Sequence, residues 1–379
     1  MNSHNPPAPG AALEALKTEI IQRREEFQAL RHIPLDIVRK FQDIGVYRAF
    51  VPTRFGGDNI SPQAFCRLIE EISMADASAG WVASFGVSAT YLASLPPETY
   101  AKIYGADPNT VFSGAMFPPW PARTTPQGFE VSGRWPWGSG VMGASIVGAG
   151  IKVEGENNPL PRTAVMPRDK ITVDETWDTM GLRATGSHDI VADKVIVPEE
   201  WTFIRGGKPQ QDDIIFHYPA MALAAQVLAV VALGTARSAL DWVRNNAISR
   251  ASVTGAPSPA ARAYIQIDYA KAEGVLMGAR SAFYDAIEHG WEQMQTKGEV
   301  DRPTMIRLRH AASKAAQDGA EAARLAFVMG GSEAMATGHP LGRAMIDAAC
   351  VAQHAFINSG SWQAAGAALF EQPTPAGYP

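Results

Sequence analysis

The hydrophobic and polar positions of the first hundred residues follow a helical period. Between residues 11 and 30, apolar residues recur every three or four positions with charged residues between them, which places an apolar stripe along one face of a helix. Ser61 before Pro62 is an N-cap and first-turn pair that predicts the start of another helix. The apolar stretch over residues 77–95 predicts one further helix, which two prolines end. The sequence therefore predicts an N-terminal helical domain over residues 11–110.

From residue 111 the pattern changes to short runs of β-branched and other apolar residues, separated by Gly, Pro and Asp. Such runs are typical of strands bounded by turns. The predicted strands are residues 129–132, 145–147, 151–153, 171–173 and 195–197. We expect this middle segment, residues 111–210, to form an antiparallel β domain.

The pattern becomes helical again over residues 211–370. The predicted helices are residues 219–246, 259–297, 304–329 and 341–370. Many alanines in these segments allow helices to cross closely, as in a four-helix bundle. The apolar run over residues 221–233 is shorter than a membrane-spanning helix requires. The predicted fold class is therefore α+β, with N-terminal helices, a middle antiparallel β domain and a C-terminal four-helix bundle.

The composition excludes several classes of protein. Of the 379 residues, 46% are hydrophobic and 19% are charged, with a net charge of −5, which is typical of a globular protein. The sequence has no run of basic residues, which argues against a nucleic-acid partner or an anionic membrane surface. Its polar, proline-rich start lacks the pattern of a signal peptide. Its two cysteines, Cys66 and Cys350, cannot form a disulfide framework or a metal cluster, so we expect a cytoplasmic protein without a bound metal.

Three separated stretches carry conspicuous glycine- and arginine-containing motifs. They are Gly45-Val46-Tyr47 with Phe55-Gly56-Gly57, Met180-Gly181-Leu182-Arg183 with Thr185-Gly186-Ser187, and Gly330-Gly331 with Pro340, Arg343 and Asp347. In this order they resemble the motifs of the acyl-CoA dehydrogenase superfamily, whose members also consist of helices, then a β domain, then a helical bundle. The resemblance covers nearly the whole chain and implies that fold.

Two further features distinguish between the activities of this superfamily. Acyl-CoA dehydrogenation requires a carboxylate that removes a proton from the substrate. The two segments in which dehydrogenases carry this base, here residues 351–358 and 214–233, contain no acidic residue. Instead, Ser-Gly-Arg-Trp-Pro-Trp-Gly-Ser-Gly at residues 132–140, with His354 in the last predicted helix, resembles the oxygenase components of two-component flavin monooxygenases. This branch includes oxygenases of p-hydroxyphenylacetate and of indole-3-acetate.

The resemblance implies the cofactor and the partners. Reduced FMN or FAD, supplied by a separate NAD(P)H:flavin reductase, is expected to react with O₂ to give a flavin hydroperoxide that oxygenates a small aromatic or heteroaromatic substrate. The reductase is expected to be a separate protein because the chain has no glycine fingerprint of a dinucleotide-binding fold. Homotetramers are usual for this fold, so we expect a homotetramer.

The resemblance also implies the residues of a flavin site. Ser139 is in the position of the hydroxyl residue near the flavin N5, and His354 is expected to donate a proton or to exchange one with the substrate near neutral pH. These two are the predicted catalytic residues. The predicted cofactor-binding residues are Trp137, Ser139, Arg183, Thr185, Ser187, Arg250, Gly330 and Gly331. Val253 replaces a phenylalanine of the family motif, so the choice between FMN and FAD stays open.

The predicted substrate-binding residues are Phe85, Ser88, Tyr91, Ser113, Phe117 and Trp120. Relatives that hydroxylate phenols carry a histidine at the position of Ser88, and a serine is not a comparable base for a phenol. The aromatic side chains suit a flat apolar ring such as indole or an indole-3-alkanoate, for example indole-3-acetate. The alternatives are an atypical acyl-CoA dehydrogenase, a phenol ortho-hydroxylase of the same fold and a catalytically inactive flavin-binding homologue.

Overall fold

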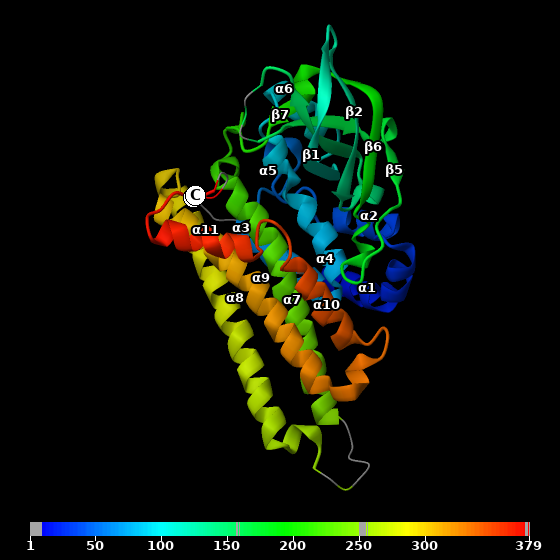
Figure 1. Cartoon of the computed structure of the whole chain (residues 1–379), viewed down its shortest axis with the longest axis vertical. Coiled ribbons are helices and arrows are strands. Elements are labelled where there is room, and N and C mark those ends of the chain that lie inside the picture. Colours follow the sequence, from blue (N-terminus) through cyan, green and yellow to red (C-terminus); the bar gives the residue numbers. More distant parts are fainter. Residues whose placement is uncertain are drawn as a thin grey trace.

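The structure is a computed structural model that describes residues 10–156, 158, 160–249, 255, 257–375 and 378. Figure 1 shows a β sheet above a bundle of long helices, with the N-terminal helices packed beside both. The N-terminal helices are α1 (Ala11–Leu30), α2 (Leu35–Asp43), α3 (Pro62–Ala75), α4 (Ala77–Ser84), α5 (Ser88–Leu92) and α6 (Pro97–Ala106).

Local hydrogen bonds set where the N-terminal helices begin and end. Ser61 caps α3 as expected, since its Oγ accepts a hydrogen bond of 3.2 Å from the backbone N–H of Ala64. The single helix predicted over residues 77–95 is wrong, because a 3-10 turn at residues 85–87 separates α4 from α5. Serine hydroxyls on both sides of this turn donate to backbone carbonyls three residues earlier, and such local bonds compete with regular helical hydrogen bonding.

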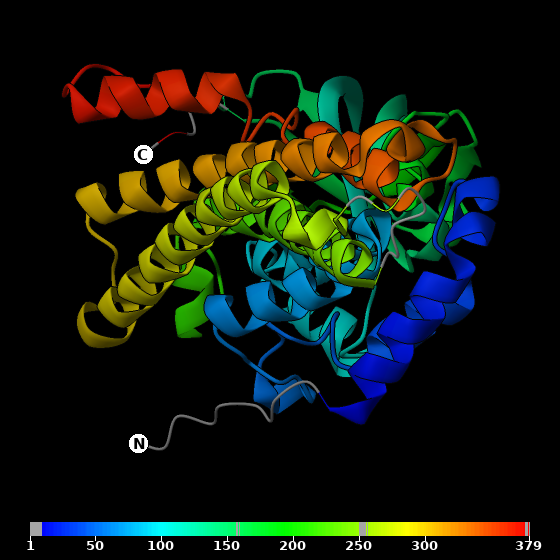
Figure 2. The same cartoon turned by 90° about the horizontal axis from the view of Figure 1, so that it is seen from below.

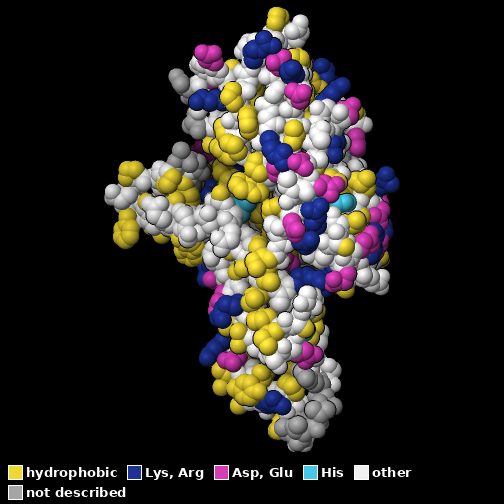
Figure 3. All heavy atoms as spheres, turned by 45° about the vertical axis from the view of Figure 1, so that its right-hand side comes forward, with side chains coloured by type: hydrophobic (Ala, Val, Ile, Leu, Met, Phe, Trp, Pro, Cys, Tyr) yellow, Lys and Arg dark blue, Asp and Glu magenta, His cyan; other side chains and the backbone are white. Residues whose placement is uncertain are grey.

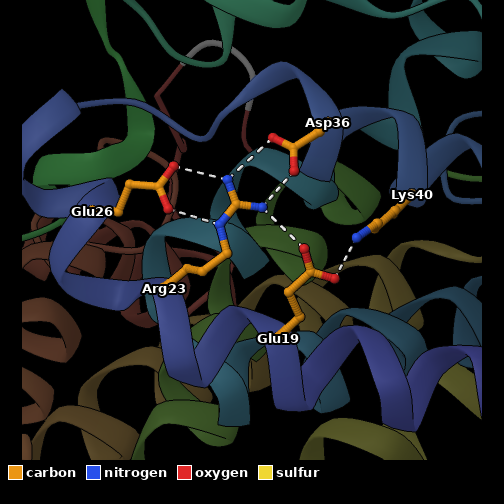
Figure 4. Close-up of polar contacts among 5 residues, drawn as sticks. All are labelled: Glu19, Arg23, Glu26, Asp36 and Lys40. Carbon is orange, nitrogen blue, oxygen red and sulfur yellow. Dashed lines mark hydrogen bonds and ion pairs between the residues drawn. The ribbon is translucent and has the colours of Figure 1, made fainter.

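A cluster of ion pairs joins α1 to α2 (Figure 4). Arg23 of α1 donates to Glu26 at 2.7 Å and to Glu19 at 3.0 Å, and it also pairs with Asp36 of α2. Lys40 of α2 pairs with the other carboxylate oxygen of Glu19. Exposed pairs of this kind contribute at most about 1 kcal/mol each. The cluster therefore orients the two helices more than it stabilises the fold.

The middle segment forms one mixed sheet of seven strands. The strands are β1 (Phe112–Thr125), β2 (Gly128–Gly138), β3 (Ile146–Val153), β4 (Arg162–Pro167), β5 (Thr172–Asp174), β6 (His188–Val197) and β7 (Thr202–Ile204), and their order is β5-β6-β2-β1-β3-β4-β7. The fully antiparallel sheet predicted from the sequence is wrong at one pair, because β1 and β3 are parallel. After β2 the chain crosses the end of β1 and returns on its other side, so β2 and β3 flank β1.

The C-terminal helices are α7 (Ala220–Ser249), α8 (Ala263–Lys297), α9 (Arg302–Gly330), α10 (Pro340–Val351) and α11 (Ser359–Leu369). Figure 2 shows α8 and α9 side by side, with α11 along the outer side of α9. The helix predicted over residues 341–370 is wrong in its middle, where residues 352–358 form the α10–α11 turn. Asn358 caps the new helix, since its side-chain oxygen accepts the N–H of Gly360 at 2.9 Å.

Helix α7 lies at the centre of the bundle. Among the described residues it is the one helix long and apolar enough to cross a membrane, but 83% of its apolar window is buried inside the protein. Burial, rather than the short apolar run seen in the sequence, therefore identifies it as a core helix. One hydrophobic core runs from the N-terminal helices through α7 into the bundle, and a second core lies within the sheet.

Candidate active site

A cavity of about 850 Å³ lies where the sheet, the N-terminal helices and the α10–α11 turn meet. Its volume is within the range of pockets that bind small molecules. Aromatic side chains dominate the lining and include Phe85, Tyr91, Phe117, Trp137, Trp177 and Phe203. The cavity is therefore suited to flat, largely apolar ring systems.

A chain of hydrogen bonds forms one wall of the cavity. The indole N–H of Trp81 donates to Ser139 Oγ at 3.2 Å, and Ser139 Oγ lies 2.7 Å from Ser187 Oγ. Ser187 Oγ lies 2.6 Å from Thr185 Oγ1, which donates to the carbonyl of Leu182 at 2.8 Å. Each hydroxyl has one proton, so Ser187 donates to Thr185 and Ser139 donates to Ser187. A lone pair of Ser139 is then left to accept a hydrogen bond from a donor in the cavity.

Trp137 presents a large apolar surface to the cavity. Its side chain is 65% exposed and its backbone φ is 65°, in the left-handed region that non-glycine residues rarely adopt. A hydrogen bond of 2.9 Å from the N–H of Ser139 to the carbonyl of Trp137 holds this turn. An exposed tryptophan on strained backbone indicates a surface that a ligand covers.

A buried carboxyl group anchors the segment that carries these hydroxyls. Asp347 of α10 accepts a hydrogen bond of 2.7 Å from the backbone N–H of Leu182. Burial, with a smaller contribution from the neighbouring carboxyl of Asp76, raises the pKa of Asp347 to about 7. Asp347 therefore connects the helical bundle to the hydroxyl wall of the cavity.

The raised pKa of Asp347 predicts a pH-dependent stability. A carboxyl group with a higher pKa in the folded protein favours the folded state at low pH, and this contribution is lost as the pH rises through the folded pKa. From pH 5 to pH 8 we expect the free energy of unfolding to fall by up to about 3 kcal/mol through this group, at about 1.4 kcal/mol per pKa unit. Asp347→Asn stays neutral and keeps an oxygen for Leu182, so it should reduce that fall. Urea unfolding at both pH values measures the effect.

The matched control is Glu98→Gln, which changes an exposed carboxylate of α6. It should leave the pH dependence of the unfolding free energy as it is in the wild type. Equal pH dependence in Asp347→Asn and in the wild type contradicts the prediction.

The sequence had predicted His354 within a helix, but it lies in the α10–α11 turn. Its ring meets the ring of Trp81 edge to face, with 5.6 Å between the centroids. Its Nδ1 accepts the backbone N–H of Phe356 at 3.3 Å, so Nε2 carries the proton of the neutral ring. Burial, together with the cation of Arg205, lowers the pKa of His354 to about 4. His354 is therefore a neutral imidazole near pH 7, and this favours donation of a hydrogen bond from Nε2–H over transfer of a proton.

Most of the predicted site residues meet at the cavity. Those in its lining are His354, Ser139, Trp137, Thr185, Ser187, Phe85, Tyr91 and Phe117.

The other predicted substrate residues, Ser88, Ser113 and Trp120, are not in the lining. The Ser88 hydroxyl donates to a backbone carbonyl of its own turn, and the indole N–H of Trp120 donates to the carbonyl of Arg134 at 2.8 Å. The Ser113 hydroxyl donates to the carbonyl of Ser139 at 2.8 Å. Ser113 therefore supports the position of Ser139 and does not itself face the cavity.

Three of the remaining predicted flavin residues, Arg183, Gly330 and Gly331, are also outside the lining. The guanidinium of Arg183 donates to the carbonyl of Gln28 at 3.1 Å and pairs with an aspartate of its own loop, so it is directed away from the cavity. Gly330 and Gly331 lie at the C-terminal end of α9. Arg250 lies outside the described residues. The roles of these four residues in flavin binding stay predictions.

Among the lining residues that the sequence did not predict, Trp81 and Arg205 stand out by their contacts. Trp81 contacts both Ser139 and His354, but in the sequence it is one aromatic residue within a stretch of small residues. Arg205 follows β7 and precedes two glycines. Nothing in that local pattern distinguishes it from an arginine of a surface loop.

The residues present fit a reduced flavin. The apolar cavity and the open face of Trp137 suit the flat isoalloxazine ring. The remaining lone pair of Ser139 suits the N–H that the reduced ring carries at N5. The donor and acceptor pattern of the wall thus matches the cofactor that the motifs imply.

Comparison with known proteins identifies the family. The protein-family model of the acyl-CoA dehydrogenase N-terminal domain matches residues 10–96. The family model of the acyl-CoA dehydrogenase C-terminal domain matches residues 226–359. An indole-3-acetate monooxygenase of Pseudomonas putida is 50% identical over 375 residues, covering 98% of this chain and 96% of the relative. The chain belongs to the flavin-dependent monooxygenase branch of the acyl-CoA dehydrogenase superfamily.

Other relatives of this monooxygenase agree with the assignment. The HsaA oxygenase subunit of a flavin-dependent monooxygenase from Rhodococcus jostii (strain RHA1) is 31% identical over 188 residues, about half of each chain. The crystal structure of 3-HSA hydroxylase from Rhodococcus sp. RHA1 has the same fold, with a TM-score of 0.89 and 24% identity, and covers 97% of this chain and 98% of its own. The predicted family, fold class and flavin cofactor are thereby confirmed.

Proposed function

We propose that this monooxygenase is the oxygenase component of a two-component system and that its substrate is indole-3-acetate. The observation that carries the proposal is the aromatic cavity in which Ser139 and His354 both contact the ring of Trp81. The indole-3-acetate monooxygenase relative, which is 50% identical over almost the full length, supports this choice of substrate.

The residues of the cavity have distinct roles in this reaction. When bound, reduced flavin supplies the two electrons with which O₂ is activated. Ser139 would accept a hydrogen bond from the flavin ring, and the apolar face of Trp137 would exclude water from that ring. His354 would offer a hydrogen bond from its Nε2–H to an oxygen atom held beside Trp81, and it would stay neutral near pH 7 in doing so.

The surroundings of Ser88 favour an indole over a phenol. The Ser88 hydroxyl donates to a backbone carbonyl, and its side chain is buried behind the lining. It therefore offers no base to a phenol oxygen in the cavity. The aromatic lining needs no such base in order to hold an indole ring.

The proposal includes two protein partners. Because the chain has no dinucleotide fingerprint, a separate NAD(P)H:flavin reductase supplies the reduced flavin. Hydrophobic side chains are visible on the surface of the helical bundle (Figure 3). The exposed apolar residues of the C-terminal segment include Tyr264, Met277, Val328, Leu369 and Phe370. Surfaces of this kind are typical of subunit contacts and support a homotetramer. The two free thiols suit the reducing cytoplasm.

The substrate is tested by supplying reduced FMN or FAD and isotopically labelled O₂ without a reductase. We expect indole-3-acetate to gain one labelled oxygen atom. We expect oxygenation of 4-hydroxyphenylacetate to be at least about tenfold less efficient, because Ser88 offers the phenol oxygen no base. Oxygenation of phenols with indoles left unchanged contradicts the proposed substrate, and oxidation of an acyl-CoA thioester with a dye acceptor contradicts the proposed reaction.

A further inference from the structure

Arg205 is the one described lining residue of the cavity that carries a formal charge near neutral pH. The lining contains no Asp, Glu or Lys, and His354 is neutral because its pKa is about 4. Arg205 lies directly after β7, the strand at one edge of the sheet. A single cation in a cavity of aromatic and small side chains requires an explanation, since an unpaired charge removed from water is costly.

The guanidinium of Arg205 lies among the residues that we assign to the substrate. Its Cζ is 5.2 Å from the centre of the Phe356 ring, over the ring face. Arg205 interacts electrostatically with Tyr91 and with His354. Both of these residues line the same cavity. Arg205 is therefore near the hydrogen-bond donor His354.

No described residue accepts a hydrogen bond from the Arg205 side chain or forms an ion pair with it. Two other partly buried arginines of this chain do have carboxylate partners. Arg237 donates to Glu273 at 2.8 Å, and Arg280 donates to Glu70 at 2.6 Å. The five N–H donors of Arg205 thus remain available in a place where burial favours an anion that would pair with them.

We propose that Arg205 binds the carboxylate of the substrate and thereby selects aromatic acids over neutral aromatics. The inference rests on the proposed function and specifies which part of the substrate this site recognises. The planar guanidinium matches a carboxylate in two parallel hydrogen bonds, and the hydroxyl of Tyr91, which has no described partner, is a further donor on the same side. Held at this end, the ring of the acid extends into the aromatic part of the cavity that Trp81 and His354 border.

A flavin phosphate is a second anion that Arg205 could pair with, and the test separates the two. Dissociation constants of indole-3-acetate and of neutral 3-methylindole are measured by calorimetry, and those of reduced FMN and FAD are measured anaerobically by fluorescence. The variant Arg205→Met keeps most of the apolar stem and removes the charge. Arg205→Lys keeps the charge and loses the paired geometry. The matched control is Arg123→Met, which changes an exposed arginine of β1.

We expect Arg205→Met to weaken indole-3-acetate binding by about 100-fold, within the range for one partner of a desolvated, hydrogen-bonded charge pair. Binding of 3-methylindole should change by less than about threefold, since that ligand has no charge to pair. Arg205→Lys should be intermediate, and Arg123→Met should match the wild type. The affinities for reduced flavin should not change in any variant. Thermal unfolding of each variant shows whether it is folded.

Two results overturn the inference. One is an equal loss of affinity for both indoles in Arg205→Met, and the other is a loss of flavin affinity with unchanged preference between the indoles. If the wild type oxygenates indole-3-acetate while either result is found, the proposed function stands and the proposed role of Arg205 fails. If the wild type binds the acid through Arg205 but oxygenates neither indole, the role of Arg205 stands and the proposed function fails.

Discussion

Replacing His354 by alanine is expected to lower the yield of oxygenated indole-3-acetate by about 100-fold, the lower end of what one positioned hydrogen-bond donor to a developing negative charge contributes. The substitution removes the N–H donor beside Trp81 but leaves the hydrogen-bonded wall of Ser139 in place. Reduced flavin should therefore still be consumed, with its electrons released as H₂O₂. The measurement is the ratio of product to H₂O₂ per reduced FMN in single turnover at pH 7.

Two variants serve as controls for this result. His354→Asn keeps an N–H donor and should retain more of the yield than alanine does. His310→Ala changes a histidine of α9 that packs on Trp362, away from the cavity, and should leave the ratio unchanged. Because the pKa of His354 is lowered to about 4, no loss of yield from its protonation is expected between pH 5.5 and 8. An unchanged ratio in His354→Ala would falsify the role of this residue.

Replacing Trp135 by alanine should have the largest effect on stability, lowering the free energy of unfolding of the β domain by about 3–5 kcal/mol. Trp135 is fully buried in the core of the sheet, and its indole N–H donates to the carbonyl of Gly150 at 2.8 Å. Alanine leaves a cavity and an unpaired buried carbonyl. Urea unfolding followed by far-UV circular dichroism measures the loss.

Two further variants separate the contributions of the buried ring and of its hydrogen bond to the loss of unfolding free energy. Trp135→Phe keeps most of the buried ring and removes the donor, so it should lower the unfolding free energy by about 1–2 kcal/mol. Trp362→Ala changes a half-exposed tryptophan of α11, so its effect should stay below about 1 kcal/mol. Similar losses for Trp135→Ala and Trp362→Ala would show that Trp135 is not a core residue in solution.

The order of helices, sheet and bundle could be predicted because it depends on local periodicity. The cap at Ser61 and the apolar stripe of α1 are both properties of neighbouring residues. The parallel pairing of β1 with β3 was not predictable in this way, because it depends on the path that the chain takes after β2. The positions of the strands in the sequence do not reveal the path that the chain takes between them.

The same distinction applies to the helices that were predicted as single segments. Residues 77–95 and 341–370 are both apolar enough for one helix each. In the first, serine hydroxyls bond locally to carbonyls, and in the second, Asn358 starts a new helix. In both places side-chain hydrogen bonds to the backbone compete with regular helical hydrogen bonds. The outcome depends on tertiary packing, which the hydrophobic period of the sequence does not reveal.

The candidate site was partly predictable, and mainly through the family motifs. Ser139, Trp137 and His354 lie in recognisable stretches, and the structure places them around one cavity. Arg205 and Trp81 could not be singled out, because their significance depends on what surrounds them. The described lining around Arg205 contains no carboxylate, and this property of the folded cavity has no signature in the loop that carries Arg205.

The location of His354 in the α10–α11 turn has an evolutionary consequence. A residue within a helix cannot shift along the axis without rotating about it, because each step turns the chain by a fixed amount. A residue in a turn between two capped helices is free of that constraint. Insertions or deletions between Val351 and Ser359 can therefore move the imidazole relative to the cavity while the two helices keep their packing. Relatives with turns of other lengths would then accept substrates of other shapes on the same scaffold.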